Sequence, residues 1–190
     1  MLDDADELFK EMLERGVFPD FYTLTTLIHG YCKDGNMTKA LSLFDTMTLR
    51  SLKPDVVTYN TLMDGFCKIG EMEKAKELWR DMISREIVPN YISFSILING
   101  FCNLGLVSEA FRLWDEMKEK GVPPDCITYN TLINGFVKEE NFDRAFFLIN
   151  KMEEQRLLPD LVTYNAILGG FSRQGRMQEA EMVLHKMIDK

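Results

Sequence analysis

Residues 56–90 read VVTYNTLMDGFCKIGEMEKAKELWRDMISREIVPN, and this stretch of 35 residues is sufficient to predict the fold. Its closing dipeptide, Pro89–Asn90, has counterparts throughout the chain at Pro19–Asp20, Pro54–Asp55, Pro124–Asp125 and Pro159–Asp160. Each of these dipeptides follows the previous one after 35 residues. A fixed period between about 20 and 50 residues is typical of solenoid proteins, in which small repeated units stack on one another.

The period divides the chain into complete and partial units. We expect the second half of a leading repeat at 1–20, complete repeats at 21–55, 56–90, 91–125 and 126–160, and a C-terminally truncated repeat at 161–190. No insertion or deletion interrupts this register. The sequence therefore predicts one continuous array, and we expect it to be a fragment of a longer protein.

Each unit contains two helical patterns separated by a break. In 56–90 the first pattern is VTYNTLMDGFCK, and the second, EMEKAKELWRDMIS, places apolar residues at helical spacing between charges. The break falls at Gly35, Gly70, Gly105 and Gly175, with Glu140 as the exception. Proline at position 34 ends the unit, because the residue before a proline is disfavoured in helical conformation. The predicted fold class is therefore all-α, built from helix-turn-helix repeats.

Small residues recur at fixed positions of the unit, counted from the residue after Pro-Asp or Pro-Asn. Position 10 is Gly30, Gly65, Gly100, Gly135 and Gly170; position 20 is alanine and position 27 is methionine in every unit. Glycine inside a helix costs about 1 kcal/mol relative to alanine. Its recurrence predicts a neighbouring helix packed too closely for a side chain, and the alanine and methionine predict contacts between helices. The aromatic residues of position 24, Phe9, Phe44, Trp79 and Trp114, predict core packing.

The charge distribution is uneven. The 190 residues carry a formal charge of −8, which argues against simple electrostatic binding to nucleic acid. Positions 1–13 of the five units carry +3, which leaves −11 for the rest of the chain. The charges of these first helices are Lys33, Asp64, Lys68, Lys138 and Arg173. We therefore expect a modestly basic stripe along the first helices and an acidic outside. No segment is apolar and long enough to span a membrane, and the N-terminus has no targeting pattern.

Segments such as VTYNTLMDGFCKIGEMEKAKELWRDMI…PN and CITYNTLINGFVK…RAFFLINKM…PD resemble pentatricopeptide repeats of the plain 35-residue class, over the whole chain. The resemblance implies a right-handed superhelix of helix hairpins that binds single-stranded RNA with one base per repeat. It implies a plant protein of mitochondria or chloroplasts, the mitochondrion being slightly favoured. Such a protein acts as an adaptor in RNA processing, stability, splicing or translation, with other RNA-processing proteins as further partners, and it needs no cofactor.

The same resemblance assigns roles to individual positions. The base-reading pairs at positions 5 and 35 are Thr25 with Asp55, Asn60 with Asn90, Ser95 with Asp125, Asn130 with Asp160, and Asn165 alone. The base-packing residues at position 2 are Tyr22, Val57, Ile92, Ile127 and Val162. The basic residues at position 13, which we expect to face phosphates, are Lys33, Lys68, Lys138 and Arg173.

Hydrogen-bonding chemistry gives this code a rationale. Aspartate only accepts hydrogen bonds, which suits the ring N–H of guanine and uracil, whereas asparagine also donates and suits the bare ring nitrogen of adenine and cytosine. A small Thr or Ser at position 5 leaves space for a purine, and the longer Asn reaches a pyrimidine. In the family's parallel orientation the chain is predicted to read 5′-G-(C/U)-G-U-pyrimidine-3′.

Each of these features has a simpler reading. Thr, Ser, Asn and Asp near a helix start are favoured as caps, and a basic residue at a helix C-terminus complements the helix dipole. A helical solenoid is also a common scaffold for binding other proteins, and this is the alternative function. A peptide groove, however, is expected to vary more freely in chemistry from unit to unit than positions 5 and 35 do.

Catalytic and metal sites are not predicted. Cys32, Cys67 and Cys102 recur at position 12, but equivalent residues of neighbouring repeats lie about 8–10 Å apart, too far to share a metal ion or a disulfide. We interpret them as small buried apolar residues, with Cys126 alone at position 1. His29 is expected in the groove and His185 among exposed charges. Neither histidine belongs to a recognisable catalytic motif, so we expect no enzyme, no membrane partner and no small-molecule substrate.

Overall fold

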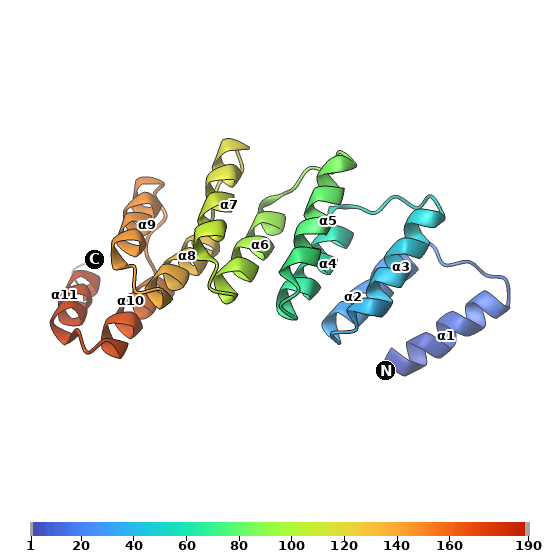
Figure 1. Ribbon diagram of the computed structural model, residues 1–190, viewed down its shortest axis with the longest axis horizontal. Coiled ribbons are helices and arrows are strands. Elements are labelled where there is room, and N and C mark those ends of the chain that lie inside the picture. Colours follow the sequence, from blue (N-terminus) through green and yellow to red (C-terminus); the bar gives the residue numbers. More distant parts are fainter. Residues whose placement is uncertain (1, 189–190) are drawn as a thin grey trace. The chain divides into compact units, whose positions relative to one another are not determined.

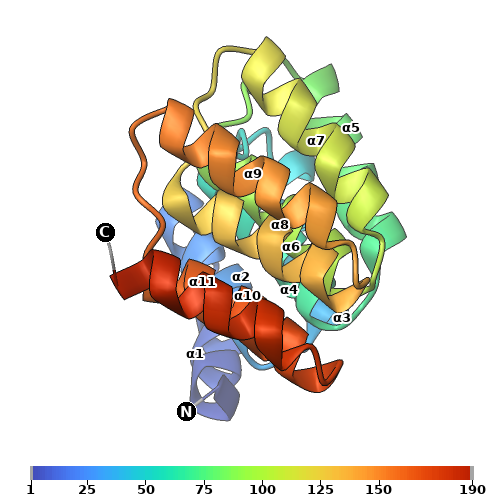
Figure 2. The same cartoon turned by 90° about the vertical axis from the view of Figure 1, so that its left-hand side faces the viewer.

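The computed structural model describes residues 2–188, with side chains described for residues 7–185 and 187, and this range contains eleven α-helices and no strand (Figure 1). The helices are α1 (Leu2–Glu14), α2 (Phe21–Lys33), α3 (Met37–Leu49), α4 (Val56–Lys68), α5 (Met72–Ser84), α6 (Tyr91–Asn103), α7 (Val107–Glu119), α8 (Cys126–Lys138), α9 (Phe142–Glu154), α10 (Leu161–Arg173) and α11 (Met177–Ile188). In antiparallel hairpins α2 packs on α3, α4 on α5, α8 on α9 and α10 on α11 (Figures 1 and 2). The predicted all-α fold of helix-turn-helix repeats is confirmed.

The first helix of each hairpin begins directly after the Pro-Asp or Pro-Asn dipeptide. Carboxylates of Asp20, Asp55 and Asp125 accept a hydrogen bond at 2.8 Å from the backbone N–H three residues later, and Asp160 does so at 3.0 Å. The side chain of Asn90 accepts the equivalent bond at 3.1 Å. Caps of this kind stabilise a helix by about 1 kcal/mol each. The capping role of position 35 is therefore confirmed, and any role in binding comes in addition to it.

The turn inside each hairpin passes through one residue with positive φ. This residue is glycine in four repeats, at Gly35, Gly70, Gly105 and Gly175, where φ lies between 68° and 80°. In the repeat of α8 and α9 it is Glu140, with φ of 61°. The predicted break, including its exception, is confirmed. An L side chain in this conformation costs about 1–2 kcal/mol, so Glu140 keeps a strain that the glycines avoid.

The interior of the hairpins consists of the recurring small and apolar residues. Alanine at position 20 and methionine at position 27 are fully buried in four repeats, at Ala40, Ala75, Ala110, Ala145, Met47, Met82, Met117 and Met152. Trp79 packs edge-on against Phe94 with ring centroids 5.0 Å apart, and Trp114 packs against Tyr129 at 5.8 Å. The core role predicted for Phe44, Trp79 and Trp114 is confirmed, whereas Phe9 is half-buried.

Glycine at position 10 lies where the preceding repeat comes close. A Cβ atom at Gly170 would lie 2.2 Å from Val137 Cγ1, and one at Gly65 would lie 2.6 Å from Met37 Sδ. At Gly135 the nearest atom, Cys102 Sγ, would be 3.0 Å away. Because all three distances are shorter than an ordinary van der Waals contact, the predicted close approach is confirmed at these positions.

The chain consists of two compact units whose border falls between Ile96 and Leu97, inside α6. In the first unit α2 contacts α4, and in the second α8 contacts α10. Within each unit, first helices of successive repeats are therefore neighbours, and this brings together their positions 2, 5 and 35. One continuous array with a right-handed superhelical path stays a prediction. None of the helices described between residues 2 and 188 is long and apolar enough to cross a bilayer.

Candidate functional site

A row of exposed apolar side chains marks position 2 of the first helices. Tyr22, Val57, Ile92, Ile127 and Val162 have between 42% and 77% of their surface exposed. Single exposed apolar residues are ordinary on a protein surface, but five at the same position of five repeats point to a contact with something outside the chain. All five were predicted to pack against bases.

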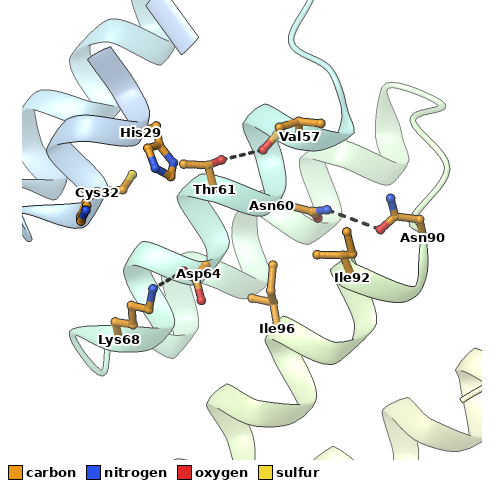
Figure 3. A pocket seen from close by; sticks show the side chains of 11 residues that line it. His29, Cys32, Val57, Asn60, Thr61, Asp64, Lys68, Asn90, Ile92 and Ile96 are labelled. Atoms are coloured by element: carbon orange, nitrogen blue, oxygen red, sulfur yellow. Dashed lines mark hydrogen bonds and ion pairs between the residues drawn. The ribbon is translucent and has the colours of Figure 1, made fainter. Parts of the chain in front are cut away.

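Two of these residues flank a pocket of about 620 Å³, which we call the α4–α6 pocket (Figure 3). Val57 of α4 and Ile92 of α6 line it, and the predicted reading pair Asn60 and Asn90 lies between them (Figure 3). The pocket thus combines two apolar walls with amide groups. This is the arrangement expected of a site that stacks a planar ring and hydrogen-bonds its edge.

Helix capping determines how the Asn60 amide is oriented. Asn90 Oδ1 accepts the Ser93 backbone N–H at 3.1 Å, so Asn90 presents an acceptor to Asn60. Asn60 Nδ2 donates to this oxygen at 3.4 Å. Asn60 Oδ1 then has no hydrogen-bond partner among the described residues, although Asn60 is only 7% exposed. A buried, unpaired carbonyl oxygen costs about 1–3 kcal/mol, which a ligand with an N–H group can recover.

The second unit repeats this arrangement in a pocket of about 530 Å³, which we call the α8–α10 pocket. Its apolar residues are Ile127 and Val162, and the predicted pair Asn130 and Asp160 lies in its lining. Asn130 Nδ2 donates to Asp160 Oδ1 at 3.1 Å. Two predicted base-reading pairs, 70 residues apart in the sequence, are therefore each joined by a hydrogen bond between flanking apolar side chains.

Asp160 is held in its ionised form by several donors. The backbone N–H of Thr163, together with the Asn130 amide, keeps the pKa of Asp160 below its ordinary value of 3.8. At neutral pH this side chain is therefore an acceptor only. Asn90, in the same position of the α4–α6 pocket, keeps a donor as well. The two pockets differ in the hydrogen-bonding edge that they offer.

The other predicted readers are placed differently. The Thr25 hydroxyl donates within its own helix to the carbonyls of Phe21 and Tyr22, at 3.0 and 3.1 Å, and no hydrogen bond joins it to Asp55 within the described part of the chain. The Ser95 hydroxyl likewise donates to Tyr91 O at 2.8 Å. Its predicted partner, Asp125, belongs to the other compact unit. Asn165 lines the α8–α10 pocket. Tyr22 lines a separate pocket with side chains of α1.

The four predicted phosphate-facing residues each end a first helix and are exposed. Two of them, Lys33 and Lys68, line the α4–α6 pocket. Lys68 also forms an ion pair with Asp64, one turn earlier on α4. An exposed pair of this type contributes little stability, so the ammonium group can exchange its partner for a phosphate. Their position also complements the helix dipole, as the simpler reading predicted.

Residues that the sequence did not single out complete the site. Thr61 lines the α4–α6 pocket, and Thr131 and Asn134 line the α8–α10 pocket. Hydroxyl groups at position 3 contact the capping residue in every repeat, at Thr23, Thr58, Ser93, Thr128 and Thr163. A Thr or Ser at position 3 in all five units was the signal that could have revealed this group.

The cysteines and histidines do not form a separate site. All four cysteines are free thiols; Cys32 and Cys102 are buried as predicted, and Cys67 and Cys126 are half-buried. Burial raises the pKa of Cys32, Cys67 and Cys102 to about 12, which keeps these thiols protonated. His29 lines the α4–α6 pocket and His185 is exposed. Within the described residues, no group of three or more His, Cys, Asp or Glu side chains is placed to hold a metal ion.

Comparison with solved structures shows which proteins share this architecture. The crystal structure of the pentatricopeptide repeat protein PPR10 from maize matches with a TM-score of 0.87 and 34% sequence identity, over 97% of this chain and 26% of PPR10. PPR10 in complex with an 18-nt psaJ RNA element matches with a TM-score of 0.80 and 34% identity, over 94% of this chain and 26% of PPR10. This chain thus spans about a quarter of the maize protein.

The PPR domain of Arabidopsis thaliana protein-only RNase P 1, solved in complex with tRNA, matches with a TM-score of 0.72, over 87% of this chain and 88% of that one. At 20% identity this likeness shows the fold alone. No curated protein sequence matches the chain significantly. Sequence profiles of the PPR repeat family match residues 1–33, 22–68, 54–103, 97–138 and 124–171, and a PPR repeat profile matches 155–188. The chain therefore belongs to the pentatricopeptide repeat family.

Proposed function

We propose that this chain binds single-stranded RNA, with one base per repeat, and reads 5′-G-(C/U)-G-U-pyrimidine-3′. The observation that carries the proposal is the repeated pocket. In both units, two apolar residues of position 2 flank a hydrogen-bonded pair from positions 5 and 35. A base inserted between the apolar walls would place its Watson–Crick edge against that pair. The RNA complex of PPR10, a relative with 34% identity, supports a nucleic-acid ligand.

The two described pairs support the predicted second and fourth bases. Asn60 Oδ1 and the Asn90 amide offer an acceptor beside a donor, which matches the amino group and bare ring nitrogen of cytosine. Asp160, an acceptor only, matches the ring N–H of uracil, while the remaining N–H of Asn130 matches a uracil carbonyl. A peptide ligand would not require this pairing, so the pockets favour RNA over the protein-scaffold alternative.

Most of the affinity in this proposal comes from bases rather than from charge. Only four basic residues stand at position 13, in a chain with a formal charge of −8. Stacking of a base on an aromatic side chain such as Tyr22 contributes about 1–3 kcal/mol, and the aliphatic residues at position 2 of the other repeats add apolar contact with the base. With four phosphate contacts at most, the logarithm of the association constant should fall with the logarithm of salt concentration with a slope no steeper than about −3.

The biological role in this proposal is that of an adaptor in RNA processing, stability, splicing or translation in a plant mitochondrion or chloroplast. The support is the resemblance to the plain 35-residue class of the family. Occupation of a single strand is sufficient for such a role, because a bound strand is shielded from nucleases and cannot pair with other RNA. Other RNA-processing proteins would then act on the strand next to the bound segment.

Titration of the chain with labelled RNA tests the proposal. We expect an RNA that contains GCGUC to bind more tightly than a scrambled strand of the same composition, at two salt concentrations. Ile127→Ser should weaken binding, because it removes an apolar wall. Leu49→Ser is the matched control, since Leu49 is 85% exposed, lies outside both pockets and should leave binding unchanged. Equal affinity for the two strands, or no binding, would favour the protein-scaffold function.

A further inference from the structure

The hydroxyl of Thr163, at position 3 of the last repeat, lies close to two oxygen atoms. In three repeats it lies 2.7–2.8 Å from the capping aspartate, as Thr23 does with Asp20, Thr58 with Asp55 and Thr128 with Asp125. The Thr163 hydroxyl lies 3.1 Å from Asp160 Oδ1 but only 2.6 Å from Asn130 Oδ1. Thr163 thus contacts the reading residue of the preceding repeat as well as its own cap.

The Thr163 hydroxyl donates its proton to the nearer of the two oxygen atoms, Asn130 Oδ1. A threonine hydroxyl has one proton to donate, and Asp160 Oδ1 already accepts from Thr163 N at 3.0 Å and from Asn130 Nδ2 at 3.1 Å. Asn130 Oδ1 is closer to the hydroxyl than Asp160 Oδ1 is. The backbone N–H of Asp160 donates to the Thr163 hydroxyl oxygen at 3.1 Å, so the hydroxyl proton points away from this N–H. Thr163 therefore donates to the amide oxygen of Asn130.

These contacts fix the Asn130 amide at both ends. Its nitrogen donates to Asp160 and its oxygen accepts from Thr163. Rotation of the amide by 180° would place its oxygen against the Asp160 carboxylate and its N–H groups against the Thr163 hydroxyl proton. The hydrogen bond to Asp160 would be lost and replaced by repulsion between two oxygen atoms, so the amide keeps the orientation in which its oxygen accepts from Thr163.

The α4–α6 pocket lacks this restraint. The Ser93 hydroxyl lies 3.1 Å from Asn90 Oδ1, and Asn60 Oδ1 has no partner within the described part of the chain. Two asparagines at the same position 5 therefore present different groups. Asn60 keeps a free acceptor, whereas Asn130 keeps only an N–H.

We propose that Thr163 is a positioning residue that sets the base preference of the α8–α10 pocket; this inference rests on the proposed function. Its hydroxyl occupies the oxygen of Asn130, so Asn130 meets the exocyclic group of the base as a donor. A uracil carbonyl accepts that N–H. The amino group of cytosine meets a second donor instead, and the pocket rejects it. Position 3 thus belongs to the base-reading group alongside positions 2, 5 and 35.

The experiment compares Thr163→Val with Thr58→Val. Both threonines are buried and both contact their capping aspartate, so each substitution removes a similar structural contact. Of these two threonines, Thr163 also contacts the position-5 residue of the preceding repeat. The position-5 residue that precedes Thr58 is Thr25, whose hydroxyl donates within α2. Affinities of the 190-residue chain and its variants are measured for GCGUC and for GCGCC, which differ at the fourth base, and for ACGUC, which differs at the first.

We expect Thr163→Val to lower the ratio of uracil to cytosine affinity at the fourth base by on the order of fivefold, which is the effect of one hydrogen bond. Thr58→Val should leave the guanine-to-adenine ratio at the first base unchanged. If the original chain discriminates uracil from cytosine and Thr163→Val discriminates equally well, or loses affinity for both strands alike, the role of Thr163 is wrong while RNA reading stands. If the original chain does not discriminate, the proposed function itself is wrong.

Discussion

The Tyr59 hydroxyl donates a hydrogen bond to the Asp81 carboxylate, and this bond joins α4 to α5. Tyr129 occupies the same position of the repeat, but its buried hydroxyl has no hydrogen-bond partner among the described residues. We expect Tyr59→Phe to lower the free energy of unfolding by about 1–2 kcal/mol, because it removes a bond to a charged group. Tyr129→Phe should be neutral or stabilising. Urea unfolding of both variants tests this contrast, and equal losses would contradict it.

The same tyrosines predict how stability responds to alkaline pH. Burial, followed by the hydrogen bond to Asp81, raises the pKa of Tyr59 above its ordinary value of 10, and burial raises the pKa of Tyr129 to about 12. Above about pH 10 the unfolded chain releases protons that the folded chain retains, so stability falls as the pH rises through this range. Below pH 10 both states keep these protons, and the two groups contribute no pH dependence.

Urea unfolding at pH 9 and pH 11 measures this loss. The variant with both Tyr59→Phe and Tyr129→Phe should lose less stability between these two pH values than the original chain. Other groups titrate equally in both proteins, so the difference between the two losses isolates the tyrosines. An identical loss in the double variant would show that these hydroxyls do not cause it.

Alanine at position 10 should be tolerated differently in different repeats. A Cβ at Gly170 would lie 2.2 Å from a methyl group of the β-branched Val137, whereas at Gly65 it would meet the flexible end of Met37. We expect Gly170→Ala to lower the free energy of unfolding by about 1–3 kcal/mol through overpacking. Gly65→Ala should change it little, because helix propensity gains about 1 kcal/mol. Thermal unfolding ranks the two variants, and the opposite order would refute the packing explanation.

Replacement of Glu140 by glycine should stabilise the second unit. Glu140 has φ of 61°, where an L side chain is strained. Glu140→Gly removes this strain and should raise the free energy of unfolding by about 1 kcal/mol. Its neighbour Glu139 has φ of −81°, so Glu139→Gly should be neutral or destabilising and serves as the control. A higher melting temperature for Glu139→Gly than for Glu140→Gly would be incompatible with this explanation.

A change at position 5 should alter the base that is bound. Asn130→Thr shortens the reading side chain in the α8–α10 pocket and leaves Asp160 in place, so the fourth base should shift from uracil towards guanine. Competition binding with the four RNAs that differ only at this base gives the ranking. The preference at the first base should stay unchanged, because Thr25 and Asp55 belong to the other compact unit. An unaltered ranking at the fourth base would defeat the assignment of Asn130.

The sequence predicted the helices closely because one repeated unit carries all of their start and stop signals. Asp55 caps the start of α4, and Gly70, with positive φ, forms the turn that follows this helix. The same pattern sets the bounds of the other first helices. The family resemblance implied that Asn60 and Asn90 act as a pair, and a hydrogen bond joins the two side chains; their reading of a base stays a prediction. A regular period makes such predictions strong, since each unit tests the interpretation of the others.

The sequence did not predict which polar atoms of the pockets remain available. Thr163 and Ser93 look equivalent in the sequence, yet the Thr163 hydroxyl contacts the reading residue of the preceding repeat, whereas the Ser93 hydroxyl contacts its own capping residue, Asn90. The outcome depends on differences of about half an ångström between competing hydrogen bonds, which no residue pattern encodes. For the same reason, the ion pair between Lys68 and Asp64 was not predicted, although both residues had been noted.

Asp160 starts α10 and also faces the α8–α10 pocket, so a single side chain serves both the scaffold and the ligand. Only a few amino acids, chiefly Asp, Asn, Ser and Thr, begin a helix well. Under the proposed RNA-binding function, a lineage that acquires a new RNA target must therefore choose among these few side chains at position 35 of each repeat. Helix initiation thus limits the set of side chains at position 35, and different RNA targets have to be distinguished by the order and number of the repeats.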